Sequence, residues 1–411
     1  MSARSESSFQ PAEAGRAAHA VALGLVLLTV SWGLLHVGFW DRNQIIDTPG
    51  YQHYGELMLD GKVPYRDFDV EYPPAALPTF VLPALADKED YASAFELLMW
   101  ACAVAAVLLV GKTLSAIGAG PARLFAASAF TGLAPLALGS VVLSRFDFWP
   151  AALVVGALAA LVAGRDRLGF GVLGLATAAK IYPAVLLPLA VVWVCRRSGR
   201  RAAVIAVTVF FAVVAAVVLP FAVLAPGGLA HSLAQQLGRP LQIESLGSAI
   251  LLAAHQLGAY DPTVVSTHGS QNLDGSLPSA LAAIQTALQL VALSVVWVVF
   301  ARGPVDRDRL LTASAAAVVA FIAFGKVLSP QFLIWLLPLV PLVAGAAGLE
   351  ACGVLAAALV TTQLWFPYRY WHVVHLQPAG WLVLVRDLLL IALFGILLAA
   401  TAREHAPRRS A

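Results

Sequence analysis

The chain has 411 residues, of which 60% are hydrophobic and 12% are charged, and its mean hydropathy is +0.81. Soluble domains carry about 25% charged residues, so this composition excludes an ordinary soluble enzyme. The formal net charge of +3 is spread among loops and does not suggest a nucleic-acid partner. Three cysteines, Cys102, Cys195 and Cys352, lie in or at the end of apolar runs without metal or redox spacing, which indicates packing in the membrane core.

Long apolar runs identify the class of protein. They approach or exceed the roughly 20 residues that cross a hydrocarbon core, at 20–40, 95–110, 202–224 and 277–300. The first run follows nineteen mostly polar or small residues and shows no small-x-small cleavage site, so we expect a retained span and not a signal peptide. We predict a single transmembrane domain over 20–401 between tails at 1–19 and 402–411.

Basic residues between the apolar runs predict the topology. By the positive-inside rule they mark cytoplasmic segments, which leaves both termini in the cytoplasm. An even number of spans must then separate successive clusters. About 28 residues lie between Arg167 and Arg196, so we predict two short helices that meet at Lys180–Pro183, and the same argument splits 310–347 at Lys326–Pro330. The six clusters are Arg4 and Arg16, Lys112 and Arg123, Arg165 and Arg167, Arg196–Arg201, Arg302–Arg309, and Arg403–Arg409.

The predicted fold class is an all-α integral membrane bundle of about twelve spans. The segment 75–86 is rich in proline and too short to cross, so we expect a re-entrant or surface helix there. Predicted external loops cover 41–90 and 225–276. The spans are expected at 20–40, 91–113, 122–143, 146–164, 168–180, 182–195, 201–224, 277–300, 309–327, 330–347, 350–366 and 379–401.

The first external loop contains ten acidic residues and a predicted short helix. Asp47 or Thr48 caps this helix, Pro49 lies in its first turn, and Gly61 with Pro64 ends it. Asp47 has two interpretations of about equal weight: a plain helix cap, or an ionised carboxylate on the outer surface that the helix end stabilises.

Further polar clusters follow at the outer ends of the predicted spans. A single cluster is weak, because Arg145 with Asp147 could be a structural ion pair and a lone lysine often extends toward the interface. Together they place four cations, Arg145, Lys180, Arg239 and Lys326, at similar outer depth, where ionisable groups are functional candidates. Such cations near an external carboxylate suit an anionic lipid-linked substrate. The clusters are Tyr65–Pro74, Ser144–Asp147, Lys180–Pro183, Arg239–Ser245 and Lys326–Gln331.

In this order, these clusters resemble the C-fold glycosyltransferases that use polyprenyl-phosphate sugars, and above all the polyprenol-phosphate-mannose-dependent alpha-1,2-mannosyltransferases of glycosyltransferase family 87. The resemblance covers residues 20–400. The matching stretches are Asp47-x-x-x-Tyr51, Val63-Pro-Tyr65, Glu71-Tyr-Pro-Pro74, Arg145-Phe-Asp147, Lys180-Ile-Tyr-Pro183 and Lys326–Gln331.

The resemblance implies a hexosyltransferase that moves a sugar, mannose first, to a glycan or glycolipid acceptor at the outer face of the cell membrane. It implies that an acidic residue of the first external loop is the general base, which is Asp47 here, with Asp41 as second candidate. It implies donor-phosphate contacts from Arg145, Lys180, Arg239 and Lys326. It suggests neither a cofactor nor a metal ion. The predicted substrate contacts are Tyr51, Tyr65, Glu71, Tyr72, Asp147, Tyr182, Glu244 and Gln331.

Two alternatives stay open at this stage. A transporter or flippase for a lipid-linked glycan would also place cations and broken helices in the membrane, but the two halves of the chain show no convincing repeat and the polar clusters map to one face. A catalytically inactive scaffold is the third hypothesis, against which the presence of Asp47 argues. The sequence leaves open which sugar and which acceptor are used, because the 231–275 loop matches no known pattern.

Overall fold

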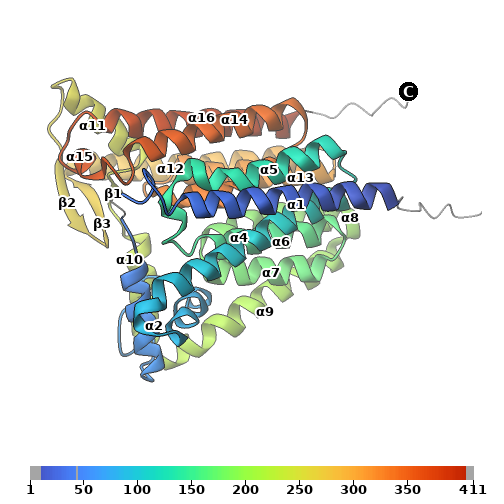
Figure 1. Ribbon diagram of the computed structural model, residues 1–411, viewed down its shortest axis with the longest axis horizontal. Coiled ribbons are helices and arrows are strands. Elements are labelled where there is room, and N and C mark those ends of the chain that lie inside the picture. Colours follow the sequence, from blue (N-terminus) through green and yellow to red (C-terminus); the bar gives the residue numbers. More distant parts are fainter. Residues whose placement is uncertain (1–10, 43–44, 404–411) are drawn as a thin grey trace, which may run out of the picture.

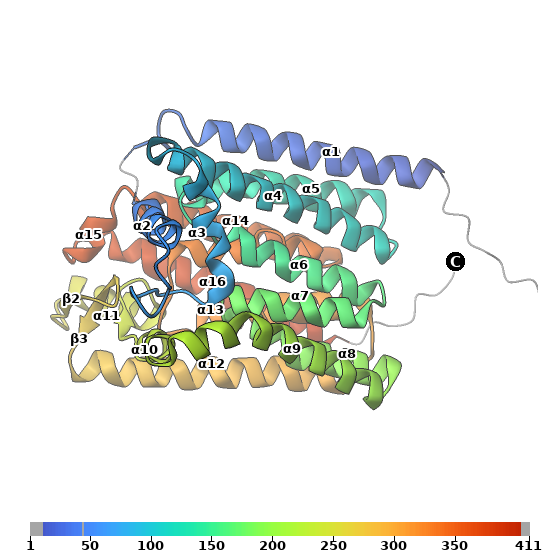
Figure 2. The same ribbon diagram turned by 90° about the horizontal axis from the view of Figure 1, so that it is seen from below.

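The chain forms a bundle of helices that lie side by side, with short helices and a small sheet gathered at one end (Figures 1 and 2). The computed structural model describes residues 11–42 and 45–403. Seven helices among these residues are long and apolar enough to cross a membrane. The helices of the bundle are α1 (Pro11–Leu34), α4 (Tyr91–Ala116), α5 (Pro121–Leu138), α6 (Phe148–Val162), α7 (Asp166–Ala179), α8 (Leu187–Ser198), α9 (Arg200–Leu224), α12 (Ser276–Arg302), α13 (Arg307–Ala323), α14 (Gly345–Trp365) and α16 (Gly380–Ala402).

Helix α13 lies in the core of the bundle. Nearly all its side chains are buried, and it packs against α12 and α16. A helix that is apolar on most sides suits such a position. At the periphery, α1 and α5 approach closely at Gly24 and Gly132. The approach requires glycine, because a Cβ atom on Gly132 would lie only 2.4 Å from the carbonyl oxygen of Gly24. Small residues at this crossing are how membrane helices gain packing contacts.

The two predicted helix breaks are confirmed. Helix α7 ends at Ala179, and a 3₁₀ turn over Tyr182–Leu186 leads into α8. Helix α13 ends at Ala323, before Lys326. At a rise of 1.5 Å per residue, the 14 residues of α7 cover only about 21 Å of a hydrocarbon core of about 30 Å. The chain therefore turns back inside the bundle.

Three predicted boundaries are wrong. The predicted span 330–347 is not an α-helix but two 3₁₀ segments, Pro330–Leu336 and Val340–Leu342, because Pro338 and Pro341 cannot donate helical hydrogen bonds. The predicted span 20–40 ends at Leu34, and the predicted span 122–143 ends at Leu138. In the second case Gly139 adopts φ +89°, which terminates α5.

The basic residues of these clusters that the structure describes lie at one end of the bundle, as predicted, whereas Arg4, Arg408 and Arg409 lie outside the described residues. Arg197 pairs with Asp166, and Arg307 donates to the carbonyl of Ala116 at 3.2 Å. Arg123 pairs with Asp308 at 2.6 Å. Arg309 donates to the carbonyl of Thr401 at 2.9 Å, close to the end of α16. These contacts join the ends of six helices, so the connecting loops share one face.

The opposite end carries the elements of the two long loops (Figure 1). The segment predicted as a short helix at 75–86 is three helical pieces, Pro74–Ala76, α3 (Pro78–Val81) and Pro83–Leu85, and the indole nitrogen of Trp149 donates to the carbonyl of Ala75 at 3.1 Å. A three-stranded antiparallel sheet of order β1-β3-β2 is an element that the sequence did not predict. The other elements are α2 (Thr48–Leu59), α10 (Pro226–Leu237), α11 (Leu246–Gln256), α15 (Tyr370–Val374), β1 (Leu241–Gln242), β2 (Thr263–Thr267) and β3 (Ser270–Asp274).

Single cysteines at the two ends should react from opposite sides of the membrane. Arg66→Cys and Ser198→Cys would be introduced at exposed positions after the three native cysteines have been replaced. In intact cells, a membrane-impermeant maleimide should label position 66, and it should label position 198 only after permeabilisation. The cysteine-free protein is the control, and labelling of both positions from the same side would contradict the topology.

Candidate active site

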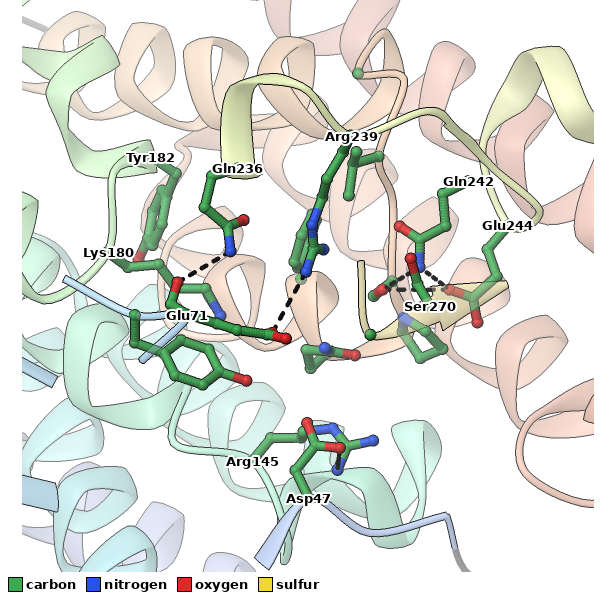
Figure 3. Close-up of a pocket in the computed structure, with 18 of the residues that line it drawn as sticks. Asp47, Glu71, Arg145, Lys180, Tyr182, Gln236, Arg239, Gln242, Glu244 and Ser270 are labelled. Carbon is green, nitrogen blue, oxygen red and sulfur yellow. Dashed lines mark hydrogen bonds and ion pairs between the residues drawn. The ribbon is translucent and has the colours of Figure 1, made fainter. Parts of the chain in front are cut away.

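A cavity of about 690 Å³ opens at the end of the bundle opposite the basic clusters. Residues from loops far apart in the sequence converge on it, as Figure 3 shows. Polar groups at this depth are tolerated where they face a water-filled space. All but two of the predicted site residues line this cavity: Asp47, Tyr51, Glu71, Tyr72, Arg145, Lys180, Tyr182, Arg239, Glu244, Lys326 and Gln331.

The carboxylate of Asp47 is held by an arginine and not by a helix end. Asp47 occupies the N-cap position of α2 but makes no capping hydrogen bond from its side chain. Its Oδ1 lies 3.0 Å from Nη1 of Arg145, whose side chain is only 5% exposed, whereas that of Asp47 is 35% exposed. The Arg145 guanidinium is itself anchored by the carbonyl of Ile45 at 3.2 Å. This geometry disfavours the plain-cap interpretation and presents an ionic carboxylate to the cavity.

A buried aromatic cluster supports the other oxygen of Asp47. The Tyr51 hydroxyl donates to Asp47 Oδ2 at 3.3 Å and lies 3.4 Å from the Tyr72 hydroxyl. Burial raises the pKa of Tyr51 well above its ordinary value, so the phenol stays protonated and remains a donor. The ring of Tyr51 also stacks on Phe80, with centroids 4.5 Å apart, which fixes its orientation.

Lys180 is anchored at the break after α7. Its ammonium lies 2.5 Å from Oδ1 of Asp147, and the same oxygen accepts from Nε1 of Trp335 at 2.6 Å. The Trp335 ring stacks on Tyr182 with centroids 3.8 Å apart. The ammonium also lies 4.6 Å from the Phe146 ring centre. A carboxylate and an aromatic surface therefore stabilise this cation on one wall of the cavity.

Arg239 and Lys326 lie on cavity walls formed by later loops. Arg239 is 3.6 Å from Glu71 and donates to the carbonyl of His268 at 3.1 Å. Lys326 donates to the carbonyl of Leu237 at 3.0 Å, and no carboxylate pairs with it among the residues that the structure describes. Lys326 is thus the cavity cation without an ionic partner in that part of the chain.

The structure places two predicted substrate-binding residues behind the wall of the cavity. Tyr65 is buried and donates to the carbonyl of Tyr72 at 2.5 Å, so it positions the loop. Asp147 is 1% exposed and is shielded by its contacts with Lys180 and Trp335. The second candidate base, Asp41, does not line the cavity. In residues 11–42 and 45–403, no group of three or more His, Cys, Asp or Glu side chains could hold a metal ion.

Several cavity residues escaped sequence reasoning. Gln242 and Ser329 bond to each other and to Glu244, while Trp335 orients Asp147. Gln289, in the apolar helix α12, donates to the carbonyl of Phe321 at 2.6 Å. The sequence could have indicated Gln289, because it is a polar residue within an apolar span. Gln242 and Ser329 lie within the predicted clusters Arg239–Ser245 and Lys326–Gln331 but were not among the predicted site residues, and no sequence signal indicates that Trp335 contacts Asp147.

Comparison with known proteins identifies the family. Residues 71–330, more than half of the chain, match the family model described as Glycosyltransferase family 87. The chain belongs to glycosyltransferase family 87. It is therefore a membrane glycosyltransferase, as the resemblance implied. The match includes Arg145, Lys180, Arg239 and Lys326 but begins after Asp47.

One solved structure that resembles this family 87 protein is the oligosaccharyltransferase of Archaeoglobus fulgidus in the apo form. The two share 13% sequence identity and a TM-score of 0.47. The similarity covers 98% of this chain and 57% of that one, so the chain spans little more than half the length of the archaeal enzyme. Comparison with curated proteins gave no match.

Removal of the carboxylate at position 147 should destabilise the protein. Asp147→Asn leaves the Lys180 ammonium buried without its counter-charge, a loss on the order of 3 kcal/mol. The double variant Asp147→Asn/Lys180→Met removes both charges and should recover part of that stability. Thermal unfolding of the detergent-purified proteins, followed by tryptophan fluorescence, measures both effects.

Asp166→Asn is the matched control, because it breaks a more exposed ion pair with Arg197 at the opposite end of the bundle. It should cost less than Asp147→Asn. A double variant no more stable than Asp147→Asn would contradict the proposed role of the pair.

Proposed function

We propose that this family 87 enzyme transfers a hexose, mannose first among the candidates, from a polyprenyl phosphate to a cell-envelope glycan or glycolipid. The observation that carries the proposal is the Asp47 carboxylate, which is ion-paired to buried Arg145 yet faces a cavity lined by further cations. A carboxylate suits proton abstraction from a hydroxyl, and cations suit a leaving phosphate. Both are available in one space.

The reaction follows from these two groups. Asp47 Oδ2, which Tyr51 contacts at the long distance of 3.3 Å, takes the proton of the acceptor hydroxyl. The acceptor oxygen then bonds to the anomeric carbon as the bond from that carbon to the phosphate oxygen breaks. The electron pair of the broken bond stays on the phosphate, so polyprenyl phosphate leaves. Attack opposite the leaving group inverts the anomeric configuration.

The charge balance of the cavity favours Lys326 as the principal phosphate contact. Arg145, Lys180 and Arg239 each face a carboxylate, from Asp47, Asp147 and Glu71 respectively. Lys326 contacts only a backbone carbonyl among the described residues, so its charge is available to an anionic ligand. The cavity is also lined by the apolar residues Leu237, Phe321 and Phe332. The lipid chain of the donor would pack against these side chains.

The proposal places the reaction at the extracytoplasmic face of the cell membrane. The arginine-rich loops lie at the opposite end of the bundle, and such loops stay in the cytoplasm. The donor would therefore present its sugar at the outer face, while its lipid stays in the bilayer. The proposed ligands are a membrane lipid-linked sugar and a glycan or glycolipid acceptor.

Asp47→Asn should reduce transfer from a polyprenyl-phosphate mannose by at least about 10²-fold, because an amide cannot take the hydroxyl proton. Affinity for the donor should persist, since Arg145 and the cations remain. Transfer by the purified protein is measured with a panel of lipid-phosphate sugars, and donor binding is measured separately.

Asp69→Asn is the control for this experiment, because Asp69 is an exposed carboxylate of the same loop outside the cavity. It should transfer at the wild-type rate. Full activity in Asp47→Asn would remove Asp47 as the base, and inactivity of the wild-type protein with every lipid-phosphate sugar would reject the donor class.

Lys326→Met should weaken binding of farnesyl phosphate, a short polyprenyl phosphate, about tenfold or more because a charge-assisted contact is lost. Lys326→Arg should retain most of the affinity. Lys112→Met, which removes an exposed lysine at the far end of α4, is the control. Unchanged binding by Lys326→Met would assign the phosphate to the other cations.

A further inference from the structure

One wall of the cavity carries a closed triangle of hydrogen bonds between Gln242, Glu244 and Ser329. Figure 3 shows Gln242 and Glu244 on this wall. Gln242 Nε2 donates to Glu244 Oε2 at 2.7 Å and to Ser329 Oγ at 2.7 Å. Ser329 Oγ donates to the same carboxylate oxygen at 3.2 Å. All three residues line the cavity, and their side chains are more than nine-tenths buried.

The triangle uses every donor that it contains. Gln242 Nε2 has two hydrogens, and both are engaged, as is the single hydroxyl hydrogen of Ser329. Gln242 Oε1 is buried and has no hydrogen-bond partner. Both bonds to Glu244 reach Oε2, and its Oε1 accepts none from the described residues. The unused capacity of the triangle therefore consists of acceptors.

The backbone holds these acceptors in place. The backbone N–H of Gln242 donates to the backbone carbonyl of Lys326 at 3.0 Å, which connects β1 to the break after α13. Arg386, fully buried in α16, donates to the backbone carbonyl of Glu244 at 2.6 Å. A wall fixed from two sides loses little entropy when it binds a ligand.

We propose that Gln242, Glu244 and Ser329 form a glycan-hydroxyl subsite, which binds adjacent free hydroxyl groups on a neutral sugar ring. Sugar hydroxyls supply the donors that unpaired acceptors require. The Glu244 carboxylate would repel a uronic acid or a phosphate in the same place. The cavity would therefore bind the phosphate near its cations and the sugar near these hydrogen-bond acceptors. The inference rests on the proposed function, and the ring belongs either to the lipid-linked donor or to the glycan acceptor.

Glu244→Gln tests the subsite with little change of shape. The side-chain oxygen of the new glutamine can accept the same bonds from Gln242 and Ser329. Its NH2 group then takes the place of the free carboxylate oxygen, so a donor faces the cavity instead of an acceptor. Because the ionic acceptor is lost, sugar affinity should fall about tenfold or more. Glu89→Gln makes the same chemical change at an exposed site outside the cavity and should leave affinity unchanged.

Binding is measured at pH 8 with three probes: farnesyl phosphate, farnesyl phosphoryl mannose and methyl α-mannopyranoside. Burial raises the pKa of Glu244 to about 7, so its carboxyl is mainly ionised at pH 8. Affinity for farnesyl phosphate should be the same in the wild type and in Glu244→Gln, which also shows that the variant is folded. A loss confined to the mannose-bearing lipid assigns the ring to the donor, and a loss confined to the methyl glycoside assigns it to the acceptor.

A series of 2-, 3- and 4-deoxy derivatives of the affected sugar probe completes the test. The wild type should bind at least one derivative about tenfold more weakly than the parent sugar, and Glu244→Gln should lose this discrimination. Equal loss for all three probes in Glu244→Gln, or no sugar-dependent binding by the wild type, would overturn the subsite. Binding that follows the expected pattern without sugar transfer would uphold the subsite and reject the proposed function.

Discussion

A charge buried at membrane depth needs an opposite charge, and the pair between Lys180 and Asp147 meets this requirement. Lys180 immediately follows α7, and Asp147 immediately precedes α6, so the pair lies where both helices end. Trp335 bonds to the same carboxylate from a third segment. This contact therefore joins three segments at the point where the two short helices end, and it forms part of one wall of the cavity.

The other charged groups of the cavity are only partly neutralised by their neighbours. Arg145 is almost fully buried and is neutralised by Asp47, but Asp47 is partly exposed to the cavity and keeps room for another partner. Lys326 lacks an ionic partner among the described residues, and Gln242 keeps an unpaired acceptor. The residual charge and the residual hydrogen-bonding capacity lie on different groups. An amphiphile with a phosphate and a neutral sugar matches that division.

Sequence patterns predicted the parts of this arrangement that depend on the order of charges along the chain. The count of residues between Arg167 and Arg196 required two short helices, because a single span would have put one basic cluster on the wrong side, and Lys180 and Pro183 within the apolar stretch located the break. The hydropathy pattern predicted a helical span over 330–347 because the segment is strongly apolar, but its prolines prevent an α-helix and it forms 3₁₀ turns. Sequence patterns also did not reveal the β-hairpin of the second long loop, whose strands depend on pairing with each other and with β1.

By itself, the sequence determined that this is a membrane bundle with its basic loops on one face and its polar clusters on the other, because hydropathy and charge act along the chain regardless of packing. Only the tertiary structure decided which polar residues face the cavity. It put Asp147 and Tyr65 behind the wall, and it brought Gln242 and Ser329 onto the wall beside Glu244. Sequence spacing cannot predict this outcome, because several of the bonds that orient these side chains join segments more than eighty residues apart, such as Gln242 to Ser329 and Trp335 to Asp147.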